Sequence, residues 1–229
     1  MEWIAERRKA ALLGAVLGDA LGVPYEFEVR SEMARKPATG MTGYGTHNQP
    51  PGTWSDDSSM MLCTAESLLV GYDPEDIARR FLRWFDEGYM TPHGETFDFG
   101  GITAEAMRAL RRGVPALEAG GAGEMDNGNG SLMRILPVAL LYAALPPEEL
   151  LRRASDVSSI THAHPRSRLA CGIYCLLAAD LLTAGPMPSA DLSRRLKDRL
   201  PQLADDIPRL TDDASLLAEL PSFHRIFNE

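Results

Sequence analysis

GTWSDDSSMML, residues 52–62, joins a Gly/Pro-rich loop to an apolar stretch with helical spacing. Ser55 or Asp56 can cap the helix that follows, because their side chains accept hydrogen bonds from its free N–H groups. The adjacent carboxylates of Asp56 and Asp57 repel each other, and a hard cation such as Mg²⁺ or Mn²⁺ relieves that repulsion. The stretch alone therefore leaves two interpretations open, a metal site and an acidic helix start.

The composition is that of a globular protein with an acidic balance. The chain has 229 residues, of which 45% are hydrophobic and 24% charged, enough for a sizeable core in one large or two small domains. A net charge of −9 argues against nucleic acid as the main partner. Three cysteines predict no disulfide framework. The polar first ten residues and the interrupted apolar segment 10–23 predict neither a signal peptide nor a membrane span, so we expect a cytoplasmic protein.

Apolar residues recur with helical spacing along most of the chain, and strand alternation and fixed-period repeats are lacking. The loops between the expected helices carry the unusual residues, which predicts an all-α domain with its chemistry at one end of the bundle. The expected helices cover about 2–21, 57–71, 74–88, 102–112, 166–182, 190–200 and 212–220.

The end of the first expected helix carries small residues and carboxylates. Gly14, Gly18 and Gly22 predict close contact with another helix. Asp19 among them is either a buried, hydrogen-bonded carboxylate or a support for a functional group. Glu26 follows among apolar neighbours, and a partly buried Glu has a raised pKa and can move a proton. An exposed Glu in a turn is the alternative.

Two later loops are also candidates for ligand contact. Residues 126–134, DNGNGSLMR, allow close approach of backbone amides, and a helix starting at about Leu132 would direct its N–H groups at a phosphate. Ordinary Asn-Gly turns are the alternative. His162 and His164 precede another helix, and the lack of a nearby Cys or an HExxH pattern argues against zinc. Contact with a ligand and a helix cap both remain open for these histidines.

Four motifs follow one another between about residue 8 and about residue 185. They are Gly18-Asp19-Ala20-Leu21-Gly22 with Glu26, then Trp54-Ser55-Asp56-Asp57-Ser58, then Gly128-Asn129-Gly130-Ser131-Leu132-Met133-Arg134, and Thr161-His162. In this order and spacing the chain resembles the ADP-ribosylglycohydrolase family, of the dinitrogenase reductase-activating glycohydrolase type. The resemblance implies an orthogonal all-α multi-helix bundle over a single domain, residues 1–229, with a dinuclear Mg²⁺ or Mn²⁺ centre.

The resemblance also implies a function, the hydrolytic removal of ADP-ribose from an ADP-ribosylated protein side chain, a small molecule or a related acceptor. Ser55, Asp56 and Asp57 would then ligate metal. Glu26, Asp56 and Asp57 would be the catalytic residues, with Glu26 positioning the substrate or moving a proton. Carboxylates suit this reaction because they stabilise the oxocarbenium character that builds at the ribose. The implied substrate-binding residues are Asp98, Gly100, Asn129, Gly130, Ser131, Met133 and His162.

The sequence departs from the family at its C-terminus. The family closes the metal site with a late Gly-Gly-Asp-x-Asp-Thr type segment, and the chain reaches Phe227-Asn228-Glu229 before that segment would be expected. We therefore expect a C-terminally short bundle in which the second half of the metal site is not found. Thr211-Asp212-Asp213-Ala214-Ser215 repeats the acidic motif superficially but is better explained as a helix N-terminus.

Three hypotheses stay open at this point. The first is a metal-dependent glycohydrolase. The second is a catalytically impaired nucleotide-binding homologue or truncated remnant. The third is a protein completed by a partner, in which exposed apolar helices drive oligomerisation. The acceptor and the choice between Mg²⁺ and Mn²⁺ are not specified by the sequence.

Overall fold

The computed structural model describes residues 2–184 and 187–228, and this part of the chain is built from helices without a β-strand. The all-α prediction is confirmed. No described helix has the length and apolar character needed to cross a bilayer. The helices are α1 (Glu2–Gly22), α2 (Arg30–Arg35), α3 (Asp56–Val70), α4 (Pro74–Glu87), α5 (Gly101–Arg111), α6 (Leu136–Tyr142), α7 (Pro147–Ser159), α8 (Pro165–Thr183), α9 (Ser189–Leu210) and α10 (Ala214–Asn228), with short 3₁₀ turns η1 (Val23–Tyr25), η2 (Gly45–His47) and η3 (Ala116–Glu118).

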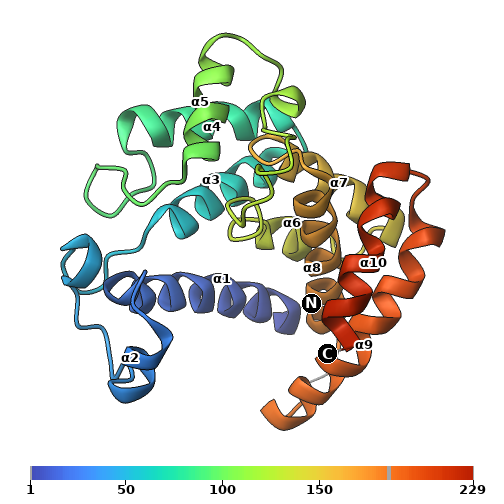
Figure 1. Cartoon of the computed structure of the whole chain (residues 1–229), viewed down its shortest axis with the longest axis horizontal. Helices are drawn as coiled ribbons and strands as arrows, with labels where there is room; N and C mark the ends of the chain where they lie inside the picture. The colour runs from blue at the N-terminus through green and yellow to red at the C-terminus, as the bar shows by residue number, and fades with distance from the viewer. Residues whose placement is uncertain (1, 185–186, 229) are drawn as a thin grey trace.

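Helix α8 packs against α6, α7, α9 and α10, while α3 packs against α1, α4 and α6 (Figure 1). In this view α1 runs horizontally below α3, with its N-terminal end beside α8, and α4 and α5 lie above α3. The main core includes Met60, Ile77, Phe81 and Trp84, all with no exposed surface. Fully burying each such side chain contributes about 1.5–3 kcal/mol, so packing rather than local helix preference holds the bundle together.

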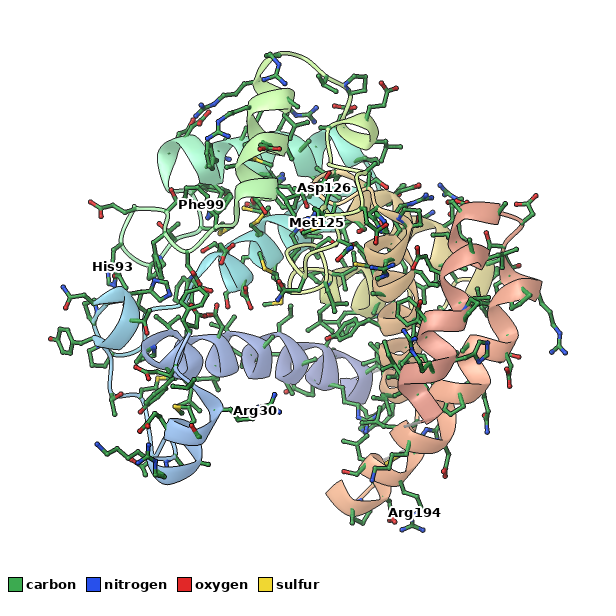
Figure 2. All side chains as sticks on the ribbon, viewed as in Figure 1. Arg30, His93, Phe99, Met125, Asp126 and Arg194 are labelled. Atoms are coloured by element: carbon green, nitrogen blue, oxygen red, sulfur yellow. The ribbon has the colours of Figure 1, made fainter. Side chains whose placement is uncertain are left out.

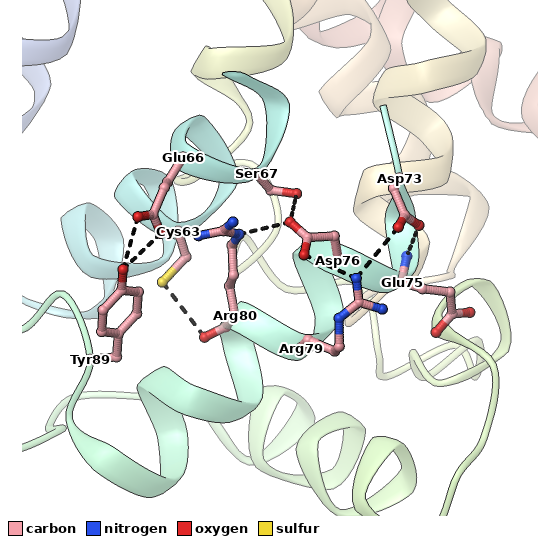
Figure 3. A network of polar contacts seen from close by, with 9 residues as sticks. All are labelled: Cys63, Glu66, Ser67, Asp73, Glu75, Asp76, Arg79, Arg80 and Tyr89. Carbon is pink, nitrogen blue, oxygen red and sulfur yellow. Dashed lines mark hydrogen bonds and ion pairs between the residues drawn. The ribbon is translucent and has the colours of Figure 1, made fainter. Parts of the chain in front are cut away.

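A polar network joins α3 to α4 (Figure 3). Arg80 lies at its centre, where Nε donates to Asp76 Oδ2 at 2.8 Å and the guanidinium pairs with Glu66. Ser67 Oγ donates to the same Asp76 oxygen at 2.6 Å, and Tyr89 OH donates to Glu66 Oε1 at 2.9 Å. Because Glu66 and Ser67 lie near the end of α3 and their partners lie on or after α4, the network fixes the direction of α3.

Proline proved a poor guide to helix ends in the C-terminal part. Helix α9 continues through Pro201 and Pro208 to Leu210, whereas the sequence predicted an end at Leu200. An interior proline costs a helix about 3 kcal/mol. Burial of Leu203 and Ile207 in the core offsets that cost, and such tertiary contacts are not visible in the local sequence. Helix α10 likewise continues beyond Pro221, and α7 was not predicted at all.

The glycine-rich loop also differs from expectation at its end. Helix α6 begins at Leu136, not at about Leu132, and Pro137 occupies its first turn, as proline often does. Residues 131–134 form turns instead, with Met133 N donating to Asn129 O at 3.1 Å.

The predicted close contact of the α1 glycines is wrong within the described chain. A Cβ added at Gly14, Gly18 or Gly22 would meet no atom within 4 Å. Helix α1 instead packs through Ala15, Val16 and neighbouring apolar residues on a small second core around Leu136.

Asp213 confirms the helix-start interpretation of the second acidic motif. Its Oδ1 accepts from Ser215 N at 3.0 Å and from Leu216 N at 3.4 Å, at the first turn of α10. Its other oxygen pairs with Arg168 Nη2 at 2.9 Å. The carboxylate is therefore occupied by protein donors.

Candidate active site

Asp19, from the last turn of α1, fixes the start of α3. Its Oδ1 accepts from Ser55 N at 3.1 Å and Ser55 Oγ at 2.9 Å, and its Oδ2 accepts from Ser58 N at 3.0 Å and Ser58 Oγ at 2.5 Å. Ser55 Oγ in turn accepts from Asp57 N at 3.2 Å and caps the helix. The cap interpretation of Ser55 is therefore correct. Asp19 is a hydrogen-bonded support that holds the acidic stretch against α1.

A cavity of about 430 Å³ opens beside this helix start. Its volume lies within the range of small-molecule sites in proteins, about 300–1,000 Å³. Five segments of the chain form its wall: the residues after η1, the start of α3, the loop before α5 with the first turn of α5, the glycine-rich loop, and His162 after α7. The lining residues are Glu26, Phe27, Asp56, Asp57, Asp98, Gly100, Gly101, Ile102, Thr103, Gly128, Asn129, Gly130, Met133 and His162.

The cavity brings together every predicted site residue except Ser55 and Ser131. Both serines are almost completely buried behind the wall. Ser131 Oγ accepts from Ser158 Oγ at 2.8 Å. Ser131 therefore lies where it supports the glycine-rich loop.

The carboxylates of the wall raise one another's pKa. Burial, followed by the charge of Asp57, raises the pKa of Asp56 to about 8. Burial, followed by the charge of Asp19, raises the pKa of Asp57 to about 6. Bringing a positive charge to these groups is therefore favourable. Their oxygen donors suit a hard divalent cation, and Mg²⁺ in particular completes its shell with water and substrate oxygens. Asp56 and Asp57 thus fit the expected Mg²⁺ or Mn²⁺.

Glu26 belongs to a second acidic group that includes a histidine absent from the sequence-based site. His47 Nε2 lies 2.6 Å from Glu26 Oε2 and 3.3 Å from Asp98 Oδ1. Phe97 flanks the imidazole at 5.4 Å between ring centroids. Burial, followed by contact with Asp98, raises the pKa of Glu26 to about 9. The donor atoms of Glu26, His47 and Asp98 lie within 4.8 Å of one another, so this group could also hold a cation.

The loop that carries His47 is held closely against the segment that carries Glu26. Thr46 Oγ1 donates to Glu26 O at 2.6 Å. Gly45 has a φ of +53°, and a Cβ there would lie 1.9 Å from Pro24 O, so only glycine fits. The only sequence feature that could have indicated a role for His47 is its position in the Gly/Pro-rich loop directly before the acidic stretch.

The glycine-rich loop and His162 form another part of the cavity wall. A Cβ at Gly130 would lie 2.7 Å from His162 Cε1, so this glycine lets the imidazole pack directly on the loop. His164 points elsewhere, because its Nδ1 accepts from Arg166 N at 3.1 Å and caps α8. The sequence left ligand contact and a helix cap open for these histidines. His162 lines the cavity, and His164 is the helix cap.

The sequence model of the ADP-ribosylglycohydrolase family matches residues 2–226. The chain belongs to this family. It is 35% identical over 145 residues to an ADP-ribosylarginine hydrolase, Tri1, of Pseudomonas putida, covering 61% of this chain and 37% of that protein. It is 32% identical to an ADP-ribosyl-[dinitrogen reductase] glycohydrolase of Rhodospirillum rubrum, covering 73% and 55% of the two chains.

The fold agrees with the family as well. A solved structure titled "ADP-ribosylglycohydrolase-related protein complex" superimposes with a TM-score of 0.70 at 33% identity, over 90% of this chain and 63% of that one. The chain spans about half the length of the curated relatives named above.

The loop before α5, residues 88–100, carries Asp98 and Gly100, which the family resemblance implied and which both line the cavity. His93, labelled in Figure 2, anchors this loop through a 2.9 Å bond between its Nε2 and Thr53 Oγ1. Trp54 Nε1 donates to Met90 O at 3.1 Å. Asp98 and Phe27, which both line the cavity, have positive φ values of 64° and 62°. Such backbone conformations carry strain in residues other than glycine and gather at functional sites.

Proposed function

We propose that this chain carries the active site of a metal-dependent hydrolase that removes ADP-ribose from an ADP-ribosylated side chain, with arginine as the first acceptor to test. The observation that carries the proposal is the convergence on one cavity of Asp56 and Asp57, of Glu26 and Asp98, and of the glycine-rich loop with His162. Two relatives whose names specify arginine or a modified protein support the acceptor class.

Asp56 and Asp57 would hold the cation at one end of the cavity. A bound Mg²⁺ or Mn²⁺ would supply positive charge that orients ribose hydroxyls and lowers the pKa of a coordinated water. The carboxylates would stabilise the positive charge that develops on the ribose ring as the glycosidic bond breaks.

Glu26 would act on the leaving group. His47 and the loop around Gly45 hold its carboxyl at the cavity, beside Asp98. In this position Glu26 can position the acceptor or transfer a proton at the scissile bond. The acidic wall also suits a guanidinium acceptor, because carboxylates bind planar guanidinium groups through paired hydrogen bonds.

The glycine-rich loop would receive the nucleotide end of the substrate. Gly128 and Gly130 expose backbone at the cavity, Met133 adds an apolar surface, and His162 adds a polar edge. Backbone amides hold a diphosphate without a basic surface, which reconciles an anionic ligand with a net charge of −9.

The first experiment is calorimetric titration of ADP-ribose with Mg²⁺, with Mn²⁺ and with a chelator. We expect metal-dependent binding that Asp56→Ala abolishes and that Asp212→Ala, at an exposed acid in the loop before α10, leaves intact. Release of ADP-ribose from ADP-ribosylarginine and ADP-ribosylserine peptides is then measured. Hydrolysis that is insensitive to both chelator and Asp56→Ala would overturn the proposal.

The sequence analysis left one alternative open, a nucleotide-binding homologue without turnover. That alternative predicts metal-dependent ADP-ribose binding and no release from any acceptor.

A further inference from the structure

Arg134 is a buried cation behind the cavity wall, with no exposed surface. Its Nη2 donates to Thr161 Oγ1 at 2.7 Å and to Val157 O at 3.2 Å, and its guanidinium lies 4.5 Å from the centre of the Phe81 ring. Its Nε and Nη1 have no hydrogen-bond partner, and no carboxylate among the described residues pairs with it. Burying an unpaired charge is costly, so Arg134 calls for a function beyond packing.

Thr161 links Arg134 to His162 through two hydrogen bonds of its hydroxyl group. A guanidinium only donates hydrogen bonds, so Thr161 Oγ1 accepts from Arg134. The Thr161 hydroxyl is itself fully buried, and its remaining partner is His162 Nδ1 at 2.8 Å. The hydroxyl must donate to Nδ1, because the reverse arrangement would leave a buried O–H without an acceptor. His162 Nδ1 therefore carries no proton.

The single proton of a neutral imidazole then lies on His162 Nε2. This edge of the ring faces the glycine-rich loop, since a Cβ at Gly130 would lie 3.1 Å from Nε2 and one at Gly128 would lie 3.6 Å from it. His162 lines the cavity, and no described residue hydrogen-bonds to Nε2. Burial and then the charge of Arg134 lower the pKa of His162 to about 4, while Asp126 opposes them, so the ring is neutral at pH 7.

We propose that Arg134 and Thr161 are positioning residues that hold His162 as the neutral Nε2–H tautomer, so that it donates a hydrogen bond to an oxygen of the bound nucleotide. The identity of the ligand rests on the proposed function, but the tautomer does not. In this arrangement His162 acts neither as a general base nor as a metal ligand through Nε2, because that nitrogen already carries a proton.

The tautomer is tested by long-range ¹H–¹⁵N NMR of the isotopically labelled protein at pH 7, where the two ring nitrogens have distinct shifts. We expect Nε2–H in the native chain and in Thr161→Ser, and a mixture of tautomers in Thr161→Val. Thr64→Val is the matched control, because Thr64 is an equally buried threonine whose hydroxyl donates to Met60 O. A native His162 that is cationic or carries its proton on Nδ1 would overturn the proposal.

Arg134 is tested in the same way. Arg134→Lys keeps a donor for Thr161 and should keep the tautomer, whereas Arg134→Met should give a mixture. If Arg134→Met does not fold, the tautomers measured in Thr161→Ser and Thr161→Val decide whether the buried hydroxyl sets the tautomer of His162.

The functional consequence is tested by ADP-ribose calorimetry in Mg²⁺. We expect Thr161→Val to weaken binding about tenfold, which corresponds to about 1.4 kcal/mol, and Thr161→Ser and Thr64→Val to stay within about twofold of the native chain. Unchanged affinity in Thr161→Val would contradict the role in ligand binding. Failure of the native chain to bind ADP-ribose would count against the proposed function. The tautomer would still be tested by the NMR measurement, which needs no ligand.

Discussion

At the scale of single residues, Asp19 shows how one carboxylate can organise a site without lining it. It accepts hydrogen bonds from two backbone N–H groups and two hydroxyls of Ser55 and Ser58, so the carboxylates of Asp56 and Asp57 keep their oxygens for a ligand. The sequence left Asp19 either as a buried, hydrogen-bonded carboxylate or as a support for a functional group, and in the structure its hydrogen bonds support the start of α3.

Replacing Asp19 should therefore affect stability and binding together. We expect Asp19→Ala to lower the free energy of unfolding by about 2–3 kcal/mol, because it leaves partly buried donors unsatisfied, and to abolish metal-dependent ADP-ribose binding. Asp19→Asn keeps one acceptor oxygen, so it should lower the free energy of unfolding by less than Asp19→Ala does. Urea unfolding provides the measurement, and a loss below about 0.5 kcal/mol in Asp19→Ala would contradict the assignment.

His47 should matter for turnover more than for nucleotide binding, because it contacts Glu26, which we propose to act on the acceptor. We expect His47→Ala to lower kcat about tenfold or more while the affinity for ADP-ribose changes little. His47→Gln, which can still donate to Glu26, should be intermediate. Steady-state kinetics separate the two effects, and a change confined to KM would contradict this role.

His162 should make the protein less stable in acid. Its folded pKa of about 4 lies below the ordinary value of 6.5, so the unfolded chain binds the proton first as the pH falls. This contribution to stability is complete above pH 6.5 and is lost as the pH falls towards 4. Relative to His162→Gln, the native chain should lose on the order of 2 kcal/mol across this window. Equal pH slopes for the two proteins would show that burial does not depress this pKa.

At the scale of elements, small residues act in opposite ways on different helices. On α8, a Cβ at Gly172 would lie 2.1 Å from Leu151 Cδ1, so this glycine lets α7 and α8 pack closely. On α1, Gly14 and Gly18 have open space where a Cβ would lie. The same residue type is thus required by packing in one helix and not in the other.

These two environments predict stability changes of opposite sign. We expect Gly14→Ala to raise the free energy of unfolding of this chain by about 0.5–1 kcal/mol, because alanine favours a helix more than glycine does. Gly172→Ala should lower it by about 1–3 kcal/mol through overpacking against Leu151. Thermal or urea unfolding tests both, and stabilisation by Gly172→Ala would mean that Leu151 moves aside freely.

At the scale of the whole molecule, the site depends on the bundle that brings its segments together. Asp19 on α1 fixes α3, the Arg80 network sets the direction of α3 against α4, and the loop from 88 to 100 returns Asp98 to the cavity. A cation bound by Asp56 and Asp57 would therefore stabilise the folded state as a whole, since the unfolded chain does not assemble this site.

Metal addition should consequently raise the melting temperature. At 100 times its dissociation constant, Mg²⁺ or Mn²⁺ should contribute about 2.7 kcal/mol, a shift of roughly 5–10 °C for a chain of this size, and a chelator should reverse it. Asp56→Asn should show little of the shift. An equal shift in Asp56→Asn would place the stabilising cation elsewhere, for instance at the group of Glu26, His47 and Asp98.

Residue type and spacing determined a good deal about this protein by themselves. They indicated α1, α3, α4, α5 and α8, because apolar periodicity and caps such as Ser55 are local properties. The serial motifs also indicated the family and most residues that line the cavity. These features can be predicted from the sequence because they depend on residues only a few positions away.

Tertiary structure alone decided the rest. It placed His47 against Glu26, made Asp19 a support, carried α9 through two prolines and linked Arg134 to His162 through Thr161. Each of these depends on contacts between residues distant in sequence, whose packing and desolvation energies outweigh local preference. The local sequence around these residues does not predict such contacts, so they are found only in the folded structure.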